Sequence, residues 1–171
     1  CFGMPSGCVE QQNCQVMLSY QLKNGQVAAE LISTDDRKRR KRSTEGQYTA
    51  FALSEDDKMG KDLVIACVEQ ADGSNEILLA WNKDSRRDSV TGVTGVTLID
   101  QVQSTEDGKF TCTFTLPKTF TASPPSTLNE PDVSFDLVNK QYNLLLATGN
   151  LDGTDKMSYH NARLASSPVN M

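Results

Sequence analysis

The fold is decided by residues 15–32, which read QVMLSYQLKNGQVAAELI. Two runs rich in β-branched, aromatic and other apolar residues, 15–22 and 27–32, flank the tetrapeptide Lys23-Asn24-Gly25-Gln26. Asn-Gly between two such runs favours a two-residue turn that joins antiparallel strands. The segment therefore predicts a β-hairpin, and it is the clearest hairpin in the chain.

Segments of the same character recur at short intervals through the rest of the sequence, separated by turn residues, and long helical periodicity is absent. About eight to ten strands at this spacing predict an all-β domain, an antiparallel β-sandwich. The further strands that we expect are residues 48–53, 63–69, 76–81, 96–103, 110–116 and 142–149, with turns at 71–75 and 106–109.

The length of 171 residues predicts a single domain over residues 1–171. Within it we expect a Cys-rich leading segment at 1–14, a basic loop at 37–42 and a Pro-containing loop at 117–131. No run approaches the roughly 18 consecutive apolar residues of a membrane span, so we expect none within this segment. The chain starts at Cys1 without an initiator Met or a hydrophobic signal region, which predicts an excised fragment or a processed chain.

The charge distribution argues against nucleic acid as a partner. The net charge is −5, and six of the 17 basic residues form the run Arg37-Lys38-Arg39-Arg40-Lys41-Arg42. Outside it, 11 basic residues face 22 acidic ones, a net charge of −11, whereas a nucleic-acid binder needs a basic face. Three interpretations of the run remain open: a solvated loop, a proprotein-convertase-like cleavage site, or a patch for anionic lipid headgroups or an acidic partner.

Five cysteines, at positions 1, 8, 14, 67 and 112, form no CxxC or CxxCH motif, which excludes a zinc ribbon, a thioredoxin-like site and covalent c-type haem. Three of them lie within the first fourteen residues, a pattern typical of disulfide formation in an oxidising, extracellular compartment. We expect Cys8 and Cys14 in bridges that fix the leading segment to the sandwich, and one odd thiol that is either left over or paired to a residue outside this segment. Cys67 and Cys112 could be buried thiols, partners of each other, or partners of Cys1.

Two single residues could carry chemistry. His160 is the sole histidine, and without a Gly-x-Ser-x-Gly motif it gives only weak support to a hydrolase; a surface or hydrogen-bonded role is the plain alternative. Met59 is an apolar side chain in the strongly polar stretch 54–62, where it could also fold back onto the core from a turn. Taken together, a thioether and an imidazole are the axial ligands that raise the potential of an electron-transfer haem.

Five stretches carry a family resemblance: residues 1–8 with Cys14, 48–54, the Lys-Met-Gly-x-Asp motif at 58–62, residues 142–149, and Tyr-His-x-x-Arg at 159–163. In this order they resemble a DOMON domain. More narrowly, they are similar to the DOMON domain of animal ferric-chelate reductase-like proteins, where it lies between a reeler domain and a transmembrane b-type cytochrome. The resemblance covers nearly the whole chain.

The resemblance implies an immunoglobulin-like sandwich with a haem pocket formed by loops at one rim. In haem-binding members, including the cytochrome domain of cellobiose dehydrogenase, a methionine and a histidine at such places ligate a non-covalent haem b. Carried over, this makes Met59 and His160 the axial ligands of the haem iron. Ala52 departs from the pattern, because many members have glycine before the loop.

The function implied is an extracellular or luminal electron-transfer domain, the soluble domain of a membrane-anchored protein. It would relay single electrons from the transmembrane cytochrome of the same parent chain to ferric chelates or another acceptor. Reductase activity would belong to the full-length assembly, and the isolated domain is not expected to be catalytic alone. The main alternative is a DOMON binding module that recognises a glycan or a protein partner without a redox centre.

Overall fold

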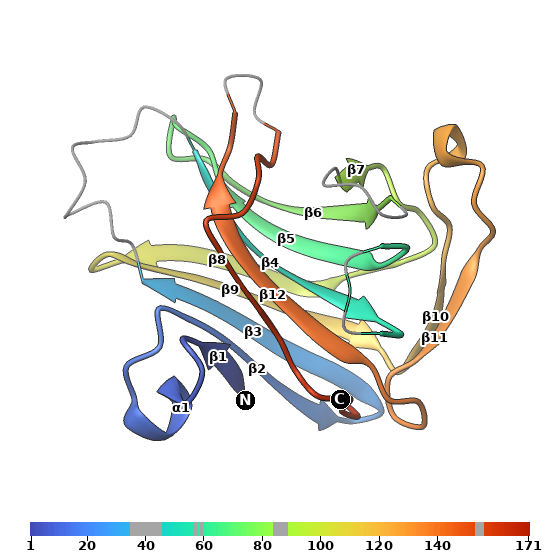
Figure 1. Cartoon of the computed structure of the whole chain (residues 1–171), viewed down its shortest axis with the longest axis horizontal. Coiled ribbons are helices and arrows are strands. Elements are labelled where there is room, and N and C mark those ends of the chain that lie inside the picture. The colour runs from blue at the N-terminus through green and yellow to red at the C-terminus, as the bar shows by residue number, and fades with distance from the viewer. Residues whose placement is uncertain (35–45, 57, 59, 84–88, 153–155) are drawn as a thin grey trace.

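Two antiparallel sheets form the body of the protein in a computed structural model, which describes residues 1–34, 46–56, 58, 60–83, 89–152 and 156–171 (Figure 1). The basic run at 37–42 and Met59 lie outside the described residues. The five-stranded sheet has the order β1-β2-β3-β9-β8. Its strands are β1 (Phe2–Met4), β2 (Val16–Lys23), β3 (Gln26–Thr34), β9 (Lys109–Pro117) and β8 (Ile99–Glu106).

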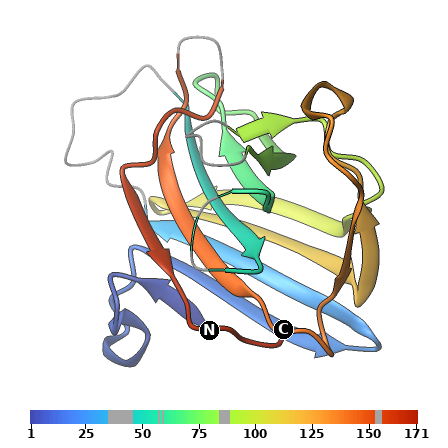
Figure 2. The ribbon, with the colours of Figure 1, turned by 45° about the vertical axis from the view of Figure 1, so that its right-hand side comes forward.

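The second sheet has six strands in the order β13-β12-β4-β5-β6-β7, and Figure 2 shows the two sheets as separate layers. Every pairing within both sheets is antiparallel, so the predicted all-β sandwich is confirmed. The strands of the second sheet are β13 (Ala162–Ala165), β12 (Asn143–Asn150), β4 (Gln47–Ser54), β5 (Leu63–Glu69), β6 (Asn75–Asn82) and β7 (Ser89–Thr91).

The hairpin turns follow from their sequences. Asn24 and Gly25 both have positive φ, 53° and 74°, and Lys23 pairs with Gln26, as a two-residue turn of the predicted type requires. Asp107 and Gly108, with φ of 51° and 76°, make the same kind of turn between β8 and β9. The turn at Asn24-Gly25 sets the register that directs alternate residues of β2 and β3 into the core.

The main core lies between the sheets and is filled by alternate residues of the strands. In β3, Val27, Ala29 and Leu31 are buried, whereas the residues between them are only half-buried, which is the period-2 pattern of a sheet with one covered face. The largest fully buried side chains of the molecule include Trp81, Tyr142, Phe51, Phe110 and Phe114.

The expected long loop at 117–131 is wrong in part. It contains β10 (Thr119–Ala122) and the 3₁₀ turn η2 (Ser126–Leu128), and β10 pairs with β11 (Val133–Asp136) as a separate two-stranded sheet. The rings of Phe120 and Phe135 stack with centroids 5.1 Å apart. Trp81 Nε1 of β6 also donates a hydrogen bond of 2.6 Å to Glu130, which connects the segment between β10 and β11 to β6. The prolines at 124, 125 and 131 lie between the two strands, so they do not prevent β10 from pairing with β11.

The cysteines form two disulfides in the described part of the chain. Cys8 and Cys14 are bonded, as expected, but to each other, so they close a short loop around α1 (Cys8–Gln11) and do not cross-link the leading segment to the sandwich. Cys67 of β5 and Cys112 of β9 are partners of each other and join the two sheets. Cys1 is the odd thiol and is exposed.

Candidate functional site

The central strands β4 and β5 of the six-stranded sheet are buried on both faces, and the outer face of the sheet carries a second apolar cluster away from the main core. All seven residues of β5 are buried, which explains why this strand reads as a continuous apolar run and not as an alternation. On the outer face small residues lie side by side on adjacent strands. Ala50 pairs with both Ala66 and Ala147, and Ala52 pairs with Val64 and Leu145.

A cavity of about 530 Å³ lies over this face. Its size falls within the range of small-molecule and cofactor sites, roughly 300 to 1,000 Å³. The small side chains leave the space, because an alanine projects only one carbon from the backbone. The sheet residues that line it include Ala50, Ala52, Val64, Leu145 and Ala147.

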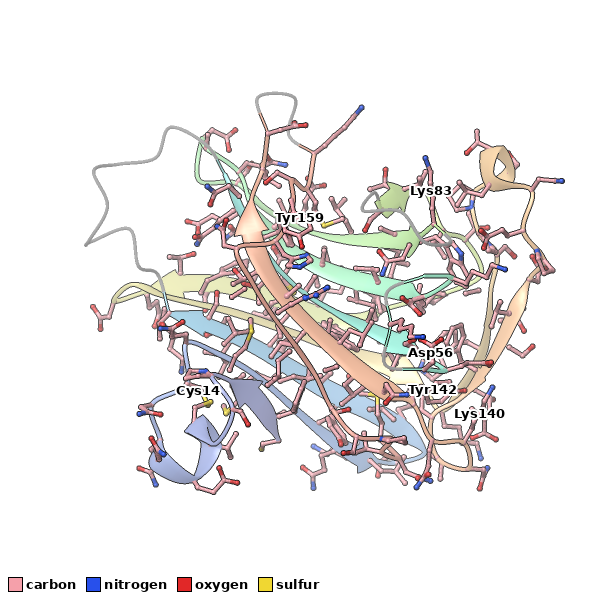
Figure 3. All side chains as sticks on the ribbon, in the orientation of Figure 1. Cys14, Asp56, Lys83, Lys140, Tyr142 and Tyr159 are labelled. Atoms are coloured by element: carbon pink, nitrogen blue, oxygen red, sulfur yellow. A yellow bond between two sulfur atoms is a disulfide. The ribbon has the colours of Figure 1, made fainter. Side chains whose placement is uncertain are left out.

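One side of the cavity is made by the segment that leads into β13. Met157, Ser158, Tyr159 and His160 all line it. Tyr159 lies beside the C-terminal end of β12 (Figure 3). The rings of Tyr159 and His160 are in contact, with centroids 4.2 Å apart, and the Nε2 atom of His160 is inaccessible to solvent. The structure therefore places the imidazole of His160 on the wall of an apolar cavity.

Hydrogen bonds hold this segment against the sheet. The Ser158 N–H donates to the Asn150 carbonyl (3.0 Å), and the Asn161 N–H donates to the Thr148 carbonyl (2.7 Å). The Tyr48 hydroxyl donates to the Ser158 carbonyl at 2.9 Å. His160 thus lies between fixed backbone positions on both sides.

The loop that contains Met59 is described only in part, so the structure does not test Met59 as a ligand. Lys58, the residue before it, lines the same cavity as His160. The Gly60 N–H donates to the buried carboxylate of Asp62 at 2.8 Å, and the Lys61 N–H donates to the Asn82 carbonyl of β6. Burial raises the pKa of Asp62. The residues around Met59 are therefore anchored to the sheet that forms the cavity floor.

Among the described residues that line the cavity, the cations are Lys58 and Arg163, and none is Asp or Glu. Arg163 is on β13, where it pairs with Ala147 and so stands at the end of the row that continues to Ala50. Within the described ranges, no group of three or more His, Cys, Asp or Glu is arranged to hold a metal ion. The cavity combines an apolar floor, one imidazole and two cations, which suits an anionic, largely apolar ligand.

The geometry differs from the expected rim pocket in one respect. Strand residues of β4, β5 and β12 form the floor, and loops supply only part of the lining. Sequence analysis did not select Tyr48 or Met157 as site residues, and it left Arg163 without a role. A signal was present in Tyr48-x-Ala50-x-Ala52, because alternate residues of a strand share a face and two small residues on one face leave a recess.

Comparison with known proteins gives one informative match. Over 175 aligned residues, which take in the whole chain, it is 29% identical to the "Putative ferric-chelate reductase 1 homolog" of Drosophila melanogaster. The chain corresponds to 24% of that protein, about a quarter of its length. No family model matches the sequence, and no solved structure matches it. Among the described residues, no helix has the length and apolar character needed to cross a membrane.

Proposed function

We propose that this chain is an electron-transfer domain of the DOMON type that holds a non-covalent haem b in the outer-face cavity, with His160 and Met59 as axial ligands. The observation that carries the proposal is the position of the sole histidine. His160, the sole histidine of the chain, lines an apolar cavity that is large enough for a cofactor. Met59 is assigned as the second ligand from the resemblance alone, because it lies outside the described residues.

The residues present fit this group. The alanines of the floor give an apolar surface with small side chains, and apolar surroundings favour burial of a macrocycle. Lys58 and Arg163 could each pair with a carboxylate of the ligand, and a guanidinium suits carboxylates especially well. When bound, haem supplies a one-electron couple whose potential is raised by a thioether ligand.

The protein's own contribution would be to hold the imidazole in place and to exclude water from it. Nε2 of His160 is inaccessible to solvent, and the ring of Tyr159 contacts the imidazole. Enclosure of this kind controls solvent access and local dielectric, and both affect the potential of a redox centre. Because both axial positions would be occupied by side chains, the site is suited to outer-sphere electron transfer and not to oxygen binding.

The wider role that we propose is the one that the resemblance implies. The chain would be an extracellular or luminal domain of a longer, membrane-anchored protein and would pass electrons from a transmembrane b-type cytochrome to ferric chelates or another acceptor. Support comes from the two disulfides, which are typical of oxidising compartments. Further support comes from the similarity to about a quarter of the Drosophila protein.

The test is an absorption spectrum of the purified chain after incubation with haem, in the oxidised and the reduced forms. We expect a six-coordinate low-spin spectrum with sharp α and β bands on reduction. His160→Ala and Met59→Ala should each abolish it. Met157→Ala is the matched control, because Met157 lines the same cavity three residues before His160 and offers a rival thioether.

Three results would contradict the proposal in different ways. A chain that stays colourless would favour the binding-module alternative. Wild-type spectra in both alanine variants would refute the ligand pair. Loss of the spectrum in Met157→Ala but not in Met59→Ala would transfer the thioether role to Met157.

A further inference from the structure

We propose that Tyr48 is a positioning residue for His160: its ring fits a notch at Gly149, and its hydroxyl holds the backbone that carries the imidazole. This inference rests on the proposed function of the cavity, which gives the position of His160 its importance. We call the hydrogen bond from the Tyr48 hydroxyl to the Ser158 carbonyl the brace. Tyr48 is on β4, and His160 follows β12 in the chain, so the brace connects parts of the chain that are more than a hundred positions apart.

The notch exists because Gly149 has no side chain. Tyr48 and Gly149 are cross-strand partners of β4 and β12. A Cβ atom added at Gly149 would lie 2.8 Å from both Cε1 and Oη of Tyr48, a distance that ordinary contacts do not reach. Gly149 is not among the glycines with positive φ, so its backbone does not require glycine. Its role is to make room for the aromatic ring.

The hydroxyl of Tyr48 adds a connection that the other bonds of the segment do not supply. The N–H groups of Ser158 and Asn161 donate to carbonyls of β12, the strand adjacent to their own segment. The Tyr48 hydroxyl instead reaches the Ser158 carbonyl from β4, one strand further into the sheet. The segment is thus fixed from two strands, which restricts its sliding and its lifting from the sheet.

Tyr48 is itself held firmly. Its side chain is buried, and the Thr148 hydroxyl donates to its backbone carbonyl at 2.9 Å. Burial raises the pKa of Tyr48 to about 12, so the hydroxyl keeps its proton and remains a donor at neutral pH. Tyr48 also lines the cavity, and its ring therefore contributes to the floor beside the segment that it braces.

The expected consequence is a fixed imidazole. Residues that orient a ligating histidine affect ligand affinity by about 10- to 100-fold when they are removed. A backbone carbonyl held two residues before the histidine acts less directly than a bond to the ring itself. We therefore expect an effect at the lower end of that range.

The experiment compares Tyr48→Phe with Tyr142→Phe. Tyr142 is a matched control because it is also buried and its hydroxyl also bonds to backbone, accepting from the Asp136 N–H at 3.0 Å. Tyr142 belongs to the main core. It lies near the N-terminal end of β12, whereas Tyr159 lies beside the C-terminal end (Figure 3). Gly149→Ala provides a second variant. It displaces the ring of Tyr48 but keeps the tyrosine and its hydroxyl.

Three measurements separate the positioning role of Tyr48 from the proposed function: two on the haem-free chain and one on the haem-loaded chain. In the haem-free chain, amide hydrogen exchange at 157–161 should become about 2- to 12-fold faster in Tyr48→Phe, the range expected for one hydrogen bond. The NMR signal of the single imidazole should also shift or broaden. In the haem-loaded chain, haem should dissociate about tenfold faster. Gly149→Ala should act in the same direction, and Tyr142→Phe should leave all three measurements unchanged.

Each outcome decides something. If Tyr48→Phe exchanges at 157–161 no faster than Tyr142→Phe, the brace is refuted, whether or not haem binds. If exchange responds and the wild-type chain takes up no haem, the brace stands and the proposed function fails. If exchange responds and the dissociation of haem does not, Tyr48 holds the segment without positioning the ligand, and the inference is wrong.

Discussion

The two faces of the six-stranded sheet differ in the size of their side chains more than in their polarity. The face toward the five-stranded sheet is packed with large residues, whereas the outer face is rich in alanine, and both are buried. Representative inner residues are Phe51, Leu53, Ile65, Trp81 and Leu144. Representative outer residues are Ala50, Ala52, Ala66 and Ala80.

The comparison shows that one sheet separates two tasks. Large residues fill the inner space to crystal-like density and account for most of the stabilisation from burial. Small residues on the outer face remove surface from water without filling the space above them, and the cavity forms there. Substitutions on the inner face should therefore alter stability, and those on the outer face should alter ligand binding.

The largest effect on stability is expected from the bridge that links the inner face to the opposite sheet. Cys67→Ala combined with Cys112→Ala opens a loop of 45 residues, which costs about 4 kcal/mol in the chain-entropy model. The Cys8–Cys14 pair closes only 6 residues and should cost about 2 kcal/mol when both are replaced. Urea unfolding of the two double variants checks the order, and a reversed order would contradict it.

Adjacent residues of β12 give the sharpest test of the two faces. Leu144 is fully buried in the main core, and Leu145 is half-buried and lines the cavity. Leu144→Ala should lower the free energy of unfolding by about 3 kcal/mol, within the range for buried leucines. Leu145→Ala should cost about 1 kcal/mol, because it borders existing space. Equal losses would show that the faces do not differ in packing.

Filling the outer face should separate stability from binding. Ala50→Leu projects into the cavity and should change the free energy of unfolding by about 1 kcal/mol or less, while weakening haem uptake at least about tenfold. Ala122→Leu, at a fully buried position of the main core that does not line the cavity, should cost about 1 to 3 kcal/mol. Haem titration and urea unfolding of both variants test this, and unchanged uptake in Ala50→Leu would rule out the cavity as the proposed haem site.

Tyr48, on the outer face, should make the free energy of unfolding depend on pH above pH 10. The pKa of Tyr48 is raised from 10.0 to about 12 by burial. Its contribution to stability is therefore present in full below pH 10 and is lost as the pH rises through 12, because the unfolded chain ionises first. Wild type should lose stability relative to Tyr48→Phe between pH 10 and 12. Phenolate absorbance should show one late-ionising group fewer in the variant.

The smallest effect is expected at an ion pair that belongs to neither face. Lys140 pairs with Glu55, and the two side chains are 47% and 68% exposed. The Glu55 carboxylate raises the pKa of Lys140, but water and salt screen a pair of this kind. Lys140→Met should change the free energy of unfolding by less than about 1 kcal/mol, and added salt should shrink the difference. A loss comparable to that of Leu144→Ala would contradict this.

The sequence predicted those parts of the fold that depend on neighbouring residues. The turn at Asn24-Gly25 and the strands around it follow from local chemistry and alternation. β10 and β11 did not follow, since their pairing depends on Phe120 meeting Phe135 across a stretch with prolines. The partners of Cys67 and Cys112 could not be deduced either, because connectivity depends on which strands face each other.

The candidate site was predicted in the same uneven way. His160 was selected from its residue type and its motif, and the structure places it on a cavity. The shape of that cavity depends on which alanines lie on one face of three strands, and so it needs the register as well as the sequence. The bond from Tyr48 to Ser158 spans 110 residues and has no local signal at all.

The arrangement of the two disulfides determines what proteolysis would leave behind. Both cysteines of one bridge precede the basic run at 37–42, and both cysteines of the other follow it. A cut in that run would therefore produce two fragments with no covalent link, held together by the pairing of β3 with β9. A cut between residues 67 and 112 would leave fragments that separate on a gel only after reduction. A cut in the basic run would therefore yield two unlinked fragments, whereas a cut at Arg86-Arg87 would yield fragments that the Cys67–Cys112 bridge still joins.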